Sequence, residues 1–236
     1  MGFFQDMLAV FKKKELVFVE SRQESEDVHS FLFEKRGDLS WKAGQYGLFH
    51  IAHTTVKKPT RPFSIASAPA ENVVRITTVV REAPSDFKKA LLELKPGMKV
   101  KVSGPVGGFH LEDGSPSLLI AGCIGITPFR SILKQIEAEG NGDGKTIQLL
   151  YLDSRKSYLY KDEFDQIAAK HPSIKVSYLE SRDELKQEIE KFTALNKNNG
   201  KYLIAGSKSF VDAVAETLTN NQIAKGNIKK DSFFGY

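Results

Sequence analysis

The chain has 236 residues, of which 41% are hydrophobic, 27% are charged and one is a cysteine. This composition is typical of a globular protein, and the length suits one large or two modest domains. A single cysteine excludes an internal disulfide bond and an iron–sulfur cluster with a full set of cysteine ligands from this chain. The net charge of +5 comes from Lys and Arg scattered among Asp and Glu, which indicates no nucleic-acid partner but suits an acidic protein partner.

The chain has no apolar run of the roughly 20 residues that a membrane-spanning helix needs. Residues 1–11 are largely apolar, and three lysines follow them. This is the reverse of the order in a secretory signal peptide. We therefore expect a short helix or arm that packs on the body, with a membrane-surface helix as the alternative. The lone cysteine favours a reducing compartment, so we expect a cytoplasmic protein.

The first half of the chain has the alternating pattern of half-buried strands. The six predicted strands lie around Leu16 and Phe18 and at residues 28–33, 44–51, 61–67, 73–80 and 98–102. One helix, residues 85–94, interrupts them, with Ser85 as its N-cap. Short strands separated by Gly and Pro turns predict a six-stranded antiparallel Greek-key β-barrel. We assign it to a first domain, residues 1–113.

After Pro116 the pattern changes to strands that alternate with helices. The predicted strands are residues 118–121, 147–152, 174–179, 202–205 and a last one near Ile228, and the predicted helices are residues 128–139, 161–169, 183–192 and 209–218. The first strand is apolar throughout, as a strand buried on both faces should be. This order predicts an α/β doubly wound domain, residues 114–236, with a five-stranded parallel sheet.

The strand that begins at Arg61 combines groups suited to a flavin nucleotide. Arg61 offers a rigid fork of donors that matches a diphosphate. Phe63 lies two residues further, so its ring and Arg61 share one face of the strand. Ser64 adds a hydroxyl next to them. The alternative is an ordinary edge strand with an exposed arginine.

A glycine-rich turn follows the first strand of the second domain. Gly122 and Gly125 allow close approach of the backbone, Thr127 is a good N-cap, and Pro128 suits the first helical position. The free N–H groups and the dipole of the following helix favour an anion. The turn therefore predicts a pyrophosphate site, with a plain tight strand–helix turn as the alternative. Cys123, within this turn, is interpreted mainly as a small residue that fits, and otherwise as a reactive thiol.

Two of these stretches resemble the ferredoxin–NADP reductase superfamily. Arg61-Pro62-Phe63-Ser64 resembles its Arg-x-Tyr-Ser motif, and the run 122–128 resembles its Gly-Gly-x-Gly-x-Thr-Pro loop. The resemblance implies that Arg61 binds the pyrophosphate of FAD, that Phe63 lies against the isoalloxazine, and that Ser64 hydrogen-bonds near N5. It also implies that the glycine loop holds NAD(P). Phe63 replaces the usual Tyr, so stacking is kept and a hydroxyl contact is lost.

The resemblance implies further site residues. Ser85 and Lys88 lie where family members contact the diphosphate again, and Gly206 lies where many have Cys-Gly-Pro beside the nicotinamide. Tyr236 resembles the terminal aromatic residue that covers the flavin.

Two stretches bear on the choice between NADP and NAD. Ser181 and Arg182 resemble the pair that NADP-using members place on the 2′-phosphate, and Arg155 adds a cation. Asp153 argues for NAD, because a free 2′-hydroxyl suits a carboxylate. The balance favours NADPH, with a solvated basic rim as the alternative role of Arg155 and Arg182.

The resemblance implies an oxidoreductase that takes hydride from NAD(P)H onto FAD and passes electrons to a carrier such as ferredoxin or flavodoxin. Pro62 belongs to the FAD-binding set, and Ser64 and Tyr236 are the candidate catalytic residues. One alternative is a flavin reductase that uses free flavin as a substrate. Another is a flavin-binding or nucleotide-binding sensor subunit without turnover. The five histidines have no metal-ligand spacing, so we expect no metal site.

Overall fold

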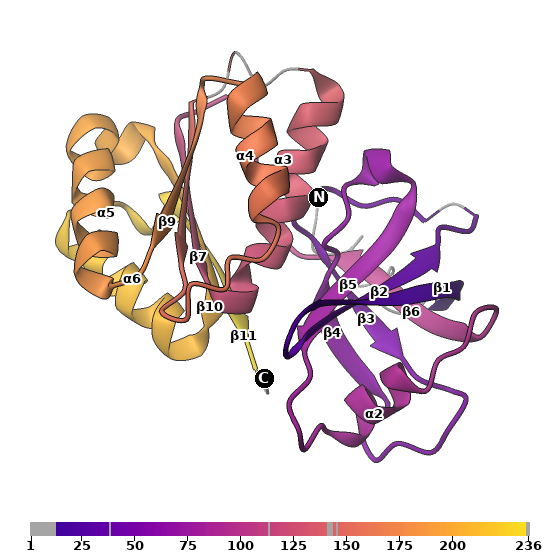
Figure 1. Ribbon diagram of the computed structural model, residues 1–236. Helices are drawn as coiled ribbons and strands as arrows, with labels where there is room; N and C mark the ends of the chain where they lie inside the picture. The colour runs from indigo at the N-terminus through magenta and orange to yellow at the C-terminus, as the bar shows by residue number, and fades with distance from the viewer. Residues whose placement is uncertain (1–12, 38, 113, 141–143, 145, 235–236) are drawn as a thin grey trace. The chain divides into compact units, whose positions relative to one another are not determined.

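A computed structural model describes residues 13–37, 39–112, 114–140, 144 and 146–234 (Figure 1). The chain divides into two compact units, one that ends at His110 and one that begins at Leu111. The predicted N-terminal arm, residues 1–11, and the predicted stacking residue Tyr236 lie outside the described residues.

The first unit is the predicted barrel, a six-stranded antiparallel sheet in the order β4-β3-β6-β1-β2-β5. Its strands are β1 (Lys13–Ser25), β2 (Val28–Glu34), β3 (Tyr46–His50), β4 (Thr60–Ser64), β5 (Val73–Val79) and β6 (Lys99–Val106). The two ends of the sheet meet just after β4, where the Ala66 N–H donates to the Arg75 carbonyl at 2.8 Å. This contact closes the sheet into a barrel.

Aromatic side chains fill the barrel. Phe18 packs edge-on against Phe33, with 5.7 Å between the ring centroids. Helix α2 (Asp86–Leu92) covers this core and buries Phe87 and Leu91 in it. A ring buries a large apolar area, so these contacts are the main source of stability in the unit.

Several strands differ in length from the prediction, and β4 and β1 show why. The strand predicted at residues 61–67 ends at Ser64, because the chain then leaves β3 and crosses to β5. Ile65 still donates to the Gln45 carbonyl at 3.0 Å, whereas Ala66 already bonds β5. Conversely, β1 is longer than predicted, since its first residues pair with β6 and the remainder pairs with β2.

The second unit contains the predicted five-stranded parallel sheet, in the order β11-β10-β7-β8-β9. Its strands are β7 (Ser117–Gly122), β8 (Ile147–Leu152), β9 (Ile174–Leu179), β10 (Lys201–Ser207) and β11 (Ile228–Phe233). Strand β7 is central and buried along its whole length, as its apolar run predicts. The chain extends from β7 toward one edge through β8 and β9, and later toward the other through β10 and β11. The switch in direction lies between β7 and β10.

Helices cover both faces of this sheet, with α3 and α4 on one face and α5 and α6 on the other (Figure 1). Their bounds are α3 (Thr127–Glu139), α4 (Lys161–Lys170), α5 (Arg182–Asn196) and α6 (Lys208–Asn220). The described residues also form short 3-10 helices: η1 (Pro69–Glu71) in the first unit, and η2 (Cys123–Ile126), η4 (Lys197–Asn199) and η5 (Lys225–Asn227) in the second.

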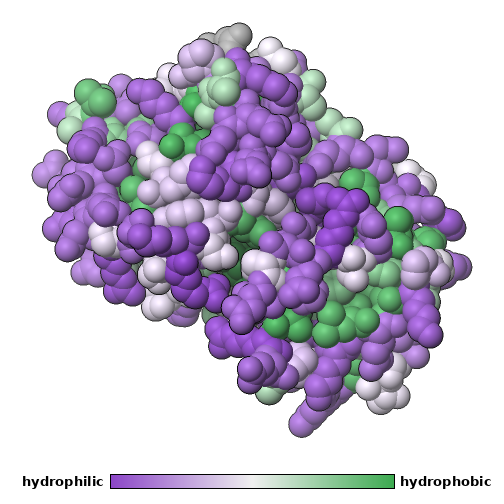
Figure 2. All heavy atoms as spheres, in the orientation of Figure 1, coloured by the Kyte–Doolittle hydropathy of each residue, from purple (hydrophilic) through white to green (hydrophobic). Residues whose placement is uncertain are grey.

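The visible surface is mostly polar. Figure 2 shows hydrophilic side chains over most of this face, with apolar side chains exposed over part of the first unit. Within the described ranges, no helix combines the length and the apolar character that crossing a membrane requires.

Candidate functional site

The candidate flavin residues of the first unit lie on β4. Arg61 pairs across the sheet with Phe49, a fully buried core residue, and Phe63 pairs with Gly47. Paired residues of neighbouring strands project to the same side, so Arg61 and Phe63 share the face of β4 that looks toward the core. Both side chains are half-buried. The Arg61 guanidinium donates to the Thr60 carbonyl at 3.1 Å.

Phe63 also contributes to the core. Its ring stacks on that of Phe87 in α2, with 5.6 Å between centroids and 28° between planes. It meets Phe49 edge-on at 6.0 Å. The face of β4 that carries Phe63 therefore also faces α2, which brings the predicted residues of the strand and the helix to one side of the barrel.

The start of α2 carries a half-buried lysine. Ser85 is the N-cap, as predicted, and its hydroxyl accepts the Lys88 N–H at 3.4 Å. The Lys88 side chain is half-buried, and burial, together with the nearby charge of Arg81, lowers its pKa from the ordinary value. An ammonium in this situation gains from an incoming anion. The residues on this side of the barrel thus fit the diphosphate of a flavin nucleotide.

The other two residues of the motif point to the opposite face of β4. Pro62 is exposed, and Ser64 is 8% exposed and pairs across the sheet with Tyr46. Because side chains alternate along a strand, the Ser64 hydroxyl lies on the other side from the Phe63 ring. The catalytic role of Ser64 stays a prediction.

The candidate residues of the second unit gather at one edge of its sheet. All five strands are parallel, so their carboxyl ends lie together, and ligands of such sheets bind at this edge, at the switch in strand order. The candidates that lie at or just after these carboxyl ends are Gly122, Gly125, Thr127, Pro128, Asp153, Arg155, Ser181, Arg182 and Gly206.

The predicted N-cap at Thr127 is wrong. Residue Ile126 caps α3, and Thr127 is the first helical residue, with its hydroxyl donating back to the Ile124 carbonyl at 3.2 Å. The cause is η2 (Cys123–Ile126), a 3-10 turn that starts with a positive φ at Cys123 and leads directly into α3. Pro128 consequently occupies the second position of α3 instead of the first. The free N–H groups expected at Thr127 belong instead to the first turn of η2, after Gly122.

The glycines of this turn allow other segments of the same chain to pack closely against its backbone. A Cβ on Gly125 would lie 2.1 Å from the Ala205 carbonyl oxygen, and one on Gly122 would lie 2.9 Å from the ring of Phe210. The same ring would be 2.8 Å from a Cβ on Gly206. These contacts fix the η2 turn against the end of β10 and define the switch point. Phe210 was not among the predicted site residues. No local sequence pattern indicates that its ring fills the space beside Gly122 and Gly206.

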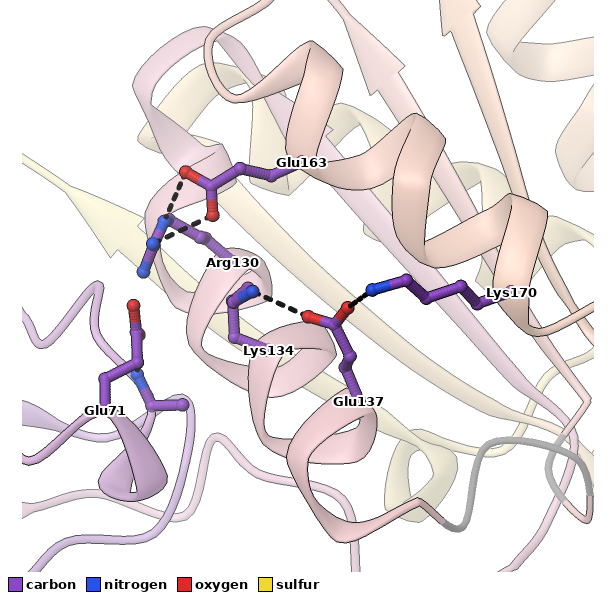
Figure 3. Close-up of polar contacts among 7 residues, drawn as sticks. Glu71, Arg130, Lys134, Glu137, Glu163 and Lys170 are labelled. Atoms are coloured by element: carbon purple, nitrogen blue, oxygen red, sulfur yellow. Dashed lines mark hydrogen bonds and ion pairs between the residues drawn. The ribbon is translucent and has the colours of Figure 1, made fainter.

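A buried ion pair anchors the helix after this turn. Arg130 is 2% exposed, and its guanidinium contacts both carboxylate oxygens of Glu163 in α4, at 2.8 and 3.3 Å (Figure 3). The guanidinium also lies 5.1 Å from the ring centroid of Tyr160. Sequence analysis did not single out Arg130. An arginine within the buried first turn of a helix was the available signal, because buried charges need a partner.

A second, weaker network joins α3 and α4. Glu137 accepts from Lys134 at 2.6 Å and from Lys170 at 2.7 Å (Figure 3). Hydrogen bonds from Lys134 and then Lys170 lower the pKa of Glu137. Together the two networks hold α3, and with it the η2 turn, in place.

The loop after β8 is shaped by Asp153. This carboxylate is buried and accepts the Arg155 N–H at 2.9 Å, and it lies 3.9 Å from the Arg155 Nε. One residue further, Lys156 pairs with Glu180 at 2.8 Å, which ties this loop to the loop after β9.

The loop after β9 begins α5 with a capping box. The Ser181 hydroxyl accepts the Glu184 N–H at 3.2 Å. In return, the Glu184 carboxylate accepts the N–H groups of Ser181 at 3.3 Å and Glu180 at 2.9 Å. Ser181 is therefore an N-cap as well as a candidate ligand, and Arg182 is exposed beside it.

Strands β10 and β11 complete the edge. Ser207 caps α6 by accepting the Phe210 N–H at 3.2 Å. In β11, Ser232 and Phe233 pair in register with Gly206 and Ser207, so the end of β11 lies beside the end of β10. In the described part of the chain, no group of three or more His, Cys, Asp or Glu is arranged to hold a metal ion.

Comparisons with known proteins agree with this architecture. A family model described as Oxidoreductase NAD-binding domain matches residues 119–216. A leaf ferredoxin–NADP reductase of rice (Oryza sativa subsp. indica) is 37% identical over 121 residues, which cover 48% of this chain and 33% of that protein. The chloroplastic ferredoxin–NADP reductase of spinach (Spinacia oleracea) is 28% identical over 233 residues, which cover 83% of this chain and 63% of that protein.

Solved structures share the whole fold. The structure of a ferredoxin–NADP⁺ reductase from Neisseria gonorrhoeae with bound FAD and NADP superposes with a TM-score of 0.78 at 19% identity, covering 94% of this chain and 99% of that one. The fold is similar to that of ferredoxin–NADP reductases, and residues 119–216 match the family model of an oxidoreductase NAD-binding domain. The chain spans one third of the length of the rice relative and 63% of the spinach relative.

Proposed function

We propose that this protein is a flavoprotein oxidoreductase that takes reducing equivalents from NAD(P)H through FAD and passes them to an electron carrier. The observation that carries the proposal is the placement of the second unit's candidate residues. All of them lie at or just after the carboxyl ends of the parallel strands β7 to β10, and all lie within the residues that match the NAD-binding family model.

In this proposal the first unit, residues 1–113 in the predicted division, holds FAD. Arg61 and Lys88 would hold the diphosphate, with the N-cap Ser85 beside them. The half-buried ring of Phe63 would support the isoalloxazine, and its contact with Phe87 fixes the orientation of that ring. Pro62 would keep the strand extended. Ser64 lies on the opposite face of β4 from the Phe63 ring, so it would hydrogen-bond the flavin at the edge of its ring, near N5. We also propose that Tyr236 covers the flavin.

The second unit, residues 114–236, would hold the nicotinamide nucleotide. Gly122, Gly125 and Gly206 would shape the crevice, and the η2 turn that leads into α3 through Thr127 and Pro128 would face the pyrophosphate. When bound, the two cofactors supply the chemistry, since a nicotinamide gives a hydride to the flavin and the reduced flavin gives electrons to an acceptor. The chain's task is to align the two rings and exclude water.

The acceptor we propose is an acidic redox protein such as ferredoxin or flavodoxin, in the cytoplasm. Charge supports this, because residues 1–110 contain 17 Lys and Arg against 12 Asp and Glu. A basic surface steers an acidic carrier toward the unit that would hold the flavin.

The test is a visible spectrum of the purified protein, before and after anaerobic addition of NADPH and of NADH. A bound flavin that either nucleotide bleaches supports the proposal. A colourless protein that oxidises nicotinamide only with added flavin would indicate a flavin reductase instead. A protein that keeps its flavin and is reduced by neither nucleotide would contradict the proposed activity and favour a sensor subunit.

A further inference from the structure

One side chain, that of Phe210, packs against the carboxyl ends of both strands at the switch point. Ala121 of β7 pairs with Ala205 of β10, and a glycine follows each of them, Gly122 and Gly206. A Cβ on Gly122 would lie 2.9 Å from the Cδ1 atom of Phe210, and a Cβ on Gly206 would lie 2.8 Å from the same atom. A single ring therefore supports the backbone of two neighbouring strand ends.

Helix α6 places this ring. The Ser207 hydroxyl caps the helix and accepts the Phe210 N–H at 3.2 Å, which fixes the first turn. Lys208 and Ser209 are exposed in that turn, whereas Phe210 is half-buried and packs against the core of the second unit. The turn directly follows the carboxyl end of β10, so the ring lies at the edge where open parallel sheets bind their ligands.

We propose that Phe210 is a positioning residue for the nicotinamide nucleotide, because its ring holds the ends of β7 and β10 in the arrangement that the nucleotide meets. The inference rests on the proposed function and adds a residue that belongs to none of the candidate motifs. Phe210 acts through Gly122 and Gly206 and takes no part in the hydride transfer itself.

The physical reason is the close packing of ring and backbone. Without the ring, the two glycines lose their contacts on one side and the strand ends relax into the space left behind. The nucleotide must then order this backbone when it binds, which lowers its affinity. A relaxed backbone also misplaces the nicotinamide relative to the flavin, and hydride transfer depends steeply on that placement.

The first test is Phe210→Ala in the intact, flavin-loaded chain. We expect the Kd of NAD⁺ or NADP⁺, whichever the native chain binds more tightly in calorimetry, to rise about tenfold. The limiting rate of flavin reduction by the matching reduced nucleotide should fall by about tenfold or more. Phe210→Met fills a similar volume and should restore most of both values.

The matched control is Val214→Ala, one turn further along α6. Val214 is 5% exposed and belongs to the same core as the inner part of the Phe210 ring. The variant should lower the urea midpoint and leave the nucleotide Kd and the rate of flavin reduction unchanged. If Phe210→Ala does not fold, Phe210→Leu takes its place, with an expected rise in Kd of about threefold.

An exchange of volume tests the contact itself. Gly122→Ala alone should weaken nucleotide binding, because its Cβ meets the ring, and the three atoms nearest to that Cβ all belong to Phe210. The double variant Gly122→Ala with Phe210→Ala should therefore bind the nucleotide more tightly than Phe210→Ala. Gly206→Ala should give no such recovery, because its Cβ would also lie 3.3 Å from the Gly122 carbonyl oxygen.

The outcomes separate this inference from the proposed function. A less stable Phe210→Ala chain that binds and oxidises the nucleotide as the native chain does would overturn the inference and leave the proposed function standing. Equal losses in Phe210→Ala and Val214→Ala would also overturn it, since the effect would then belong to the core as a whole. A native chain that binds neither NAD⁺ nor NADP⁺, and whose flavin neither reduced nucleotide bleaches, would overturn the proposed function and the inference with it.

Discussion

The two units build their candidate sites from different materials. In the first unit the candidates are side chains on a strand and a helix, Arg61, Phe63 and Lys88, carried by a barrel whose core is complete without a ligand. In the second unit the candidate site is formed mainly by backbone, at glycines and at the first turns of helices. Close packing, such as that of Gly125 against Ala205, keeps this backbone in place. A side-chain site can lose function while the fold stays intact. A backbone site cannot be altered without straining the fold.

The two units also differ in net charge. Residues 1–110 carry 17 basic against 12 acidic side chains, whereas residues 111–236 carry 17 of each. The whole net charge of +5 thus belongs to the first unit. We attribute this excess to the polyanionic cofactor and the acidic partner proposed for that unit.

The largest effect is expected from Gly125→Ala. The added Cβ would meet the Ala205 carbonyl carbon at 2.5 Å and its oxygen at 2.1 Å, and a strand backbone cannot move away cheaply. We expect a loss of about 3 kcal/mol or more in the free energy of unfolding of the second unit.

Circular dichroism and the fluorescence of Trp41, the chain's only Trp, measure this loss in separate ways. The dichroism follows both units, and Trp41 reports on the first. The control Gly226→Ala introduces a Cβ with no atom within 4 Å. Equal stability of the two variants would contradict a backbone-built site.

Arg130→Ala should come next. It removes one partner of a buried ion pair and leaves Glu163, about one third exposed, without its guanidinium. We expect a loss of about 3 kcal/mol, at the low end for such a pair because of that exposure. Urea unfolding measures it, with Lys208→Ala in the exposed pair with Asp212 as a control worth under ~0.5 kcal/mol. A loss no greater than that of the control would show that the pair does not anchor α3.

Arg61→Ala tests the first unit, where function and stability should separate. Its guanidinium bonds only the neighbouring Thr60 carbonyl within the described residues, so the free energy of unfolding should stay nearly constant. The flavin Kd should rise by the equivalent of about 1.5–3 kcal/mol, the contribution of a charged hydrogen bond. Fluorescence titration with FAD measures it, and Arg36→Ala, paired with Glu34, is the control. An unchanged flavin Kd would remove Arg61 from the site.

The smallest effect concerns pH. Hydrogen bonds from Lys134 and Lys170 lower the pKa of Glu137 in the folded chain. The resulting stability is therefore fully present above the ordinary Glu pKa of about 4.5 and is lost as pH falls through the lowered pKa. Both lysines are partly exposed, so we expect these ion pairs to contribute less than about 1 kcal/mol to the free energy of unfolding. The difference in urea midpoint between the native chain and Glu137→Gln should be present at neutral pH and vanish in acid. A difference that persists in acid would contradict this assignment.

Much of the fold could be predicted from local pattern. Alternation along the chain is sufficient to predict a half-buried strand, and the apolar run at residues 118–121 is sufficient to predict a fully buried one. Alternating burial is found in β3 and full burial in β7, whereas β2, also predicted to be half-buried, is buried along most of its length. Strand ends were less predictable, because β4 ends where the chain changes its pairing partner from β3 to β5, which is a non-local event.

The candidate-site residues also differ in whether a local sequence pattern could predict them. The capping box from Ser181 to Glu184 is a local Ser-x-x-Glu pattern, and it was available in the sequence. The Thr127 prediction failed because a 3-10 helix extends the helical backbone toward β7. The contacts of Arg130 with Glu163 and of Phe210 with Gly122 join segments far apart in the chain, so no local pattern could specify them.

The central claim is that the first unit holds a flavin and the second delivers a nicotinamide to it. Anaerobic titration of the flavin-loaded chain with NADH, followed by visible absorbance, tests it most directly. The account predicts that the flavin bleaches with stoichiometric nucleotide and recovers when an acceptor is added. A flavin spectrum unchanged by excess NADH and by excess NADPH would contradict it.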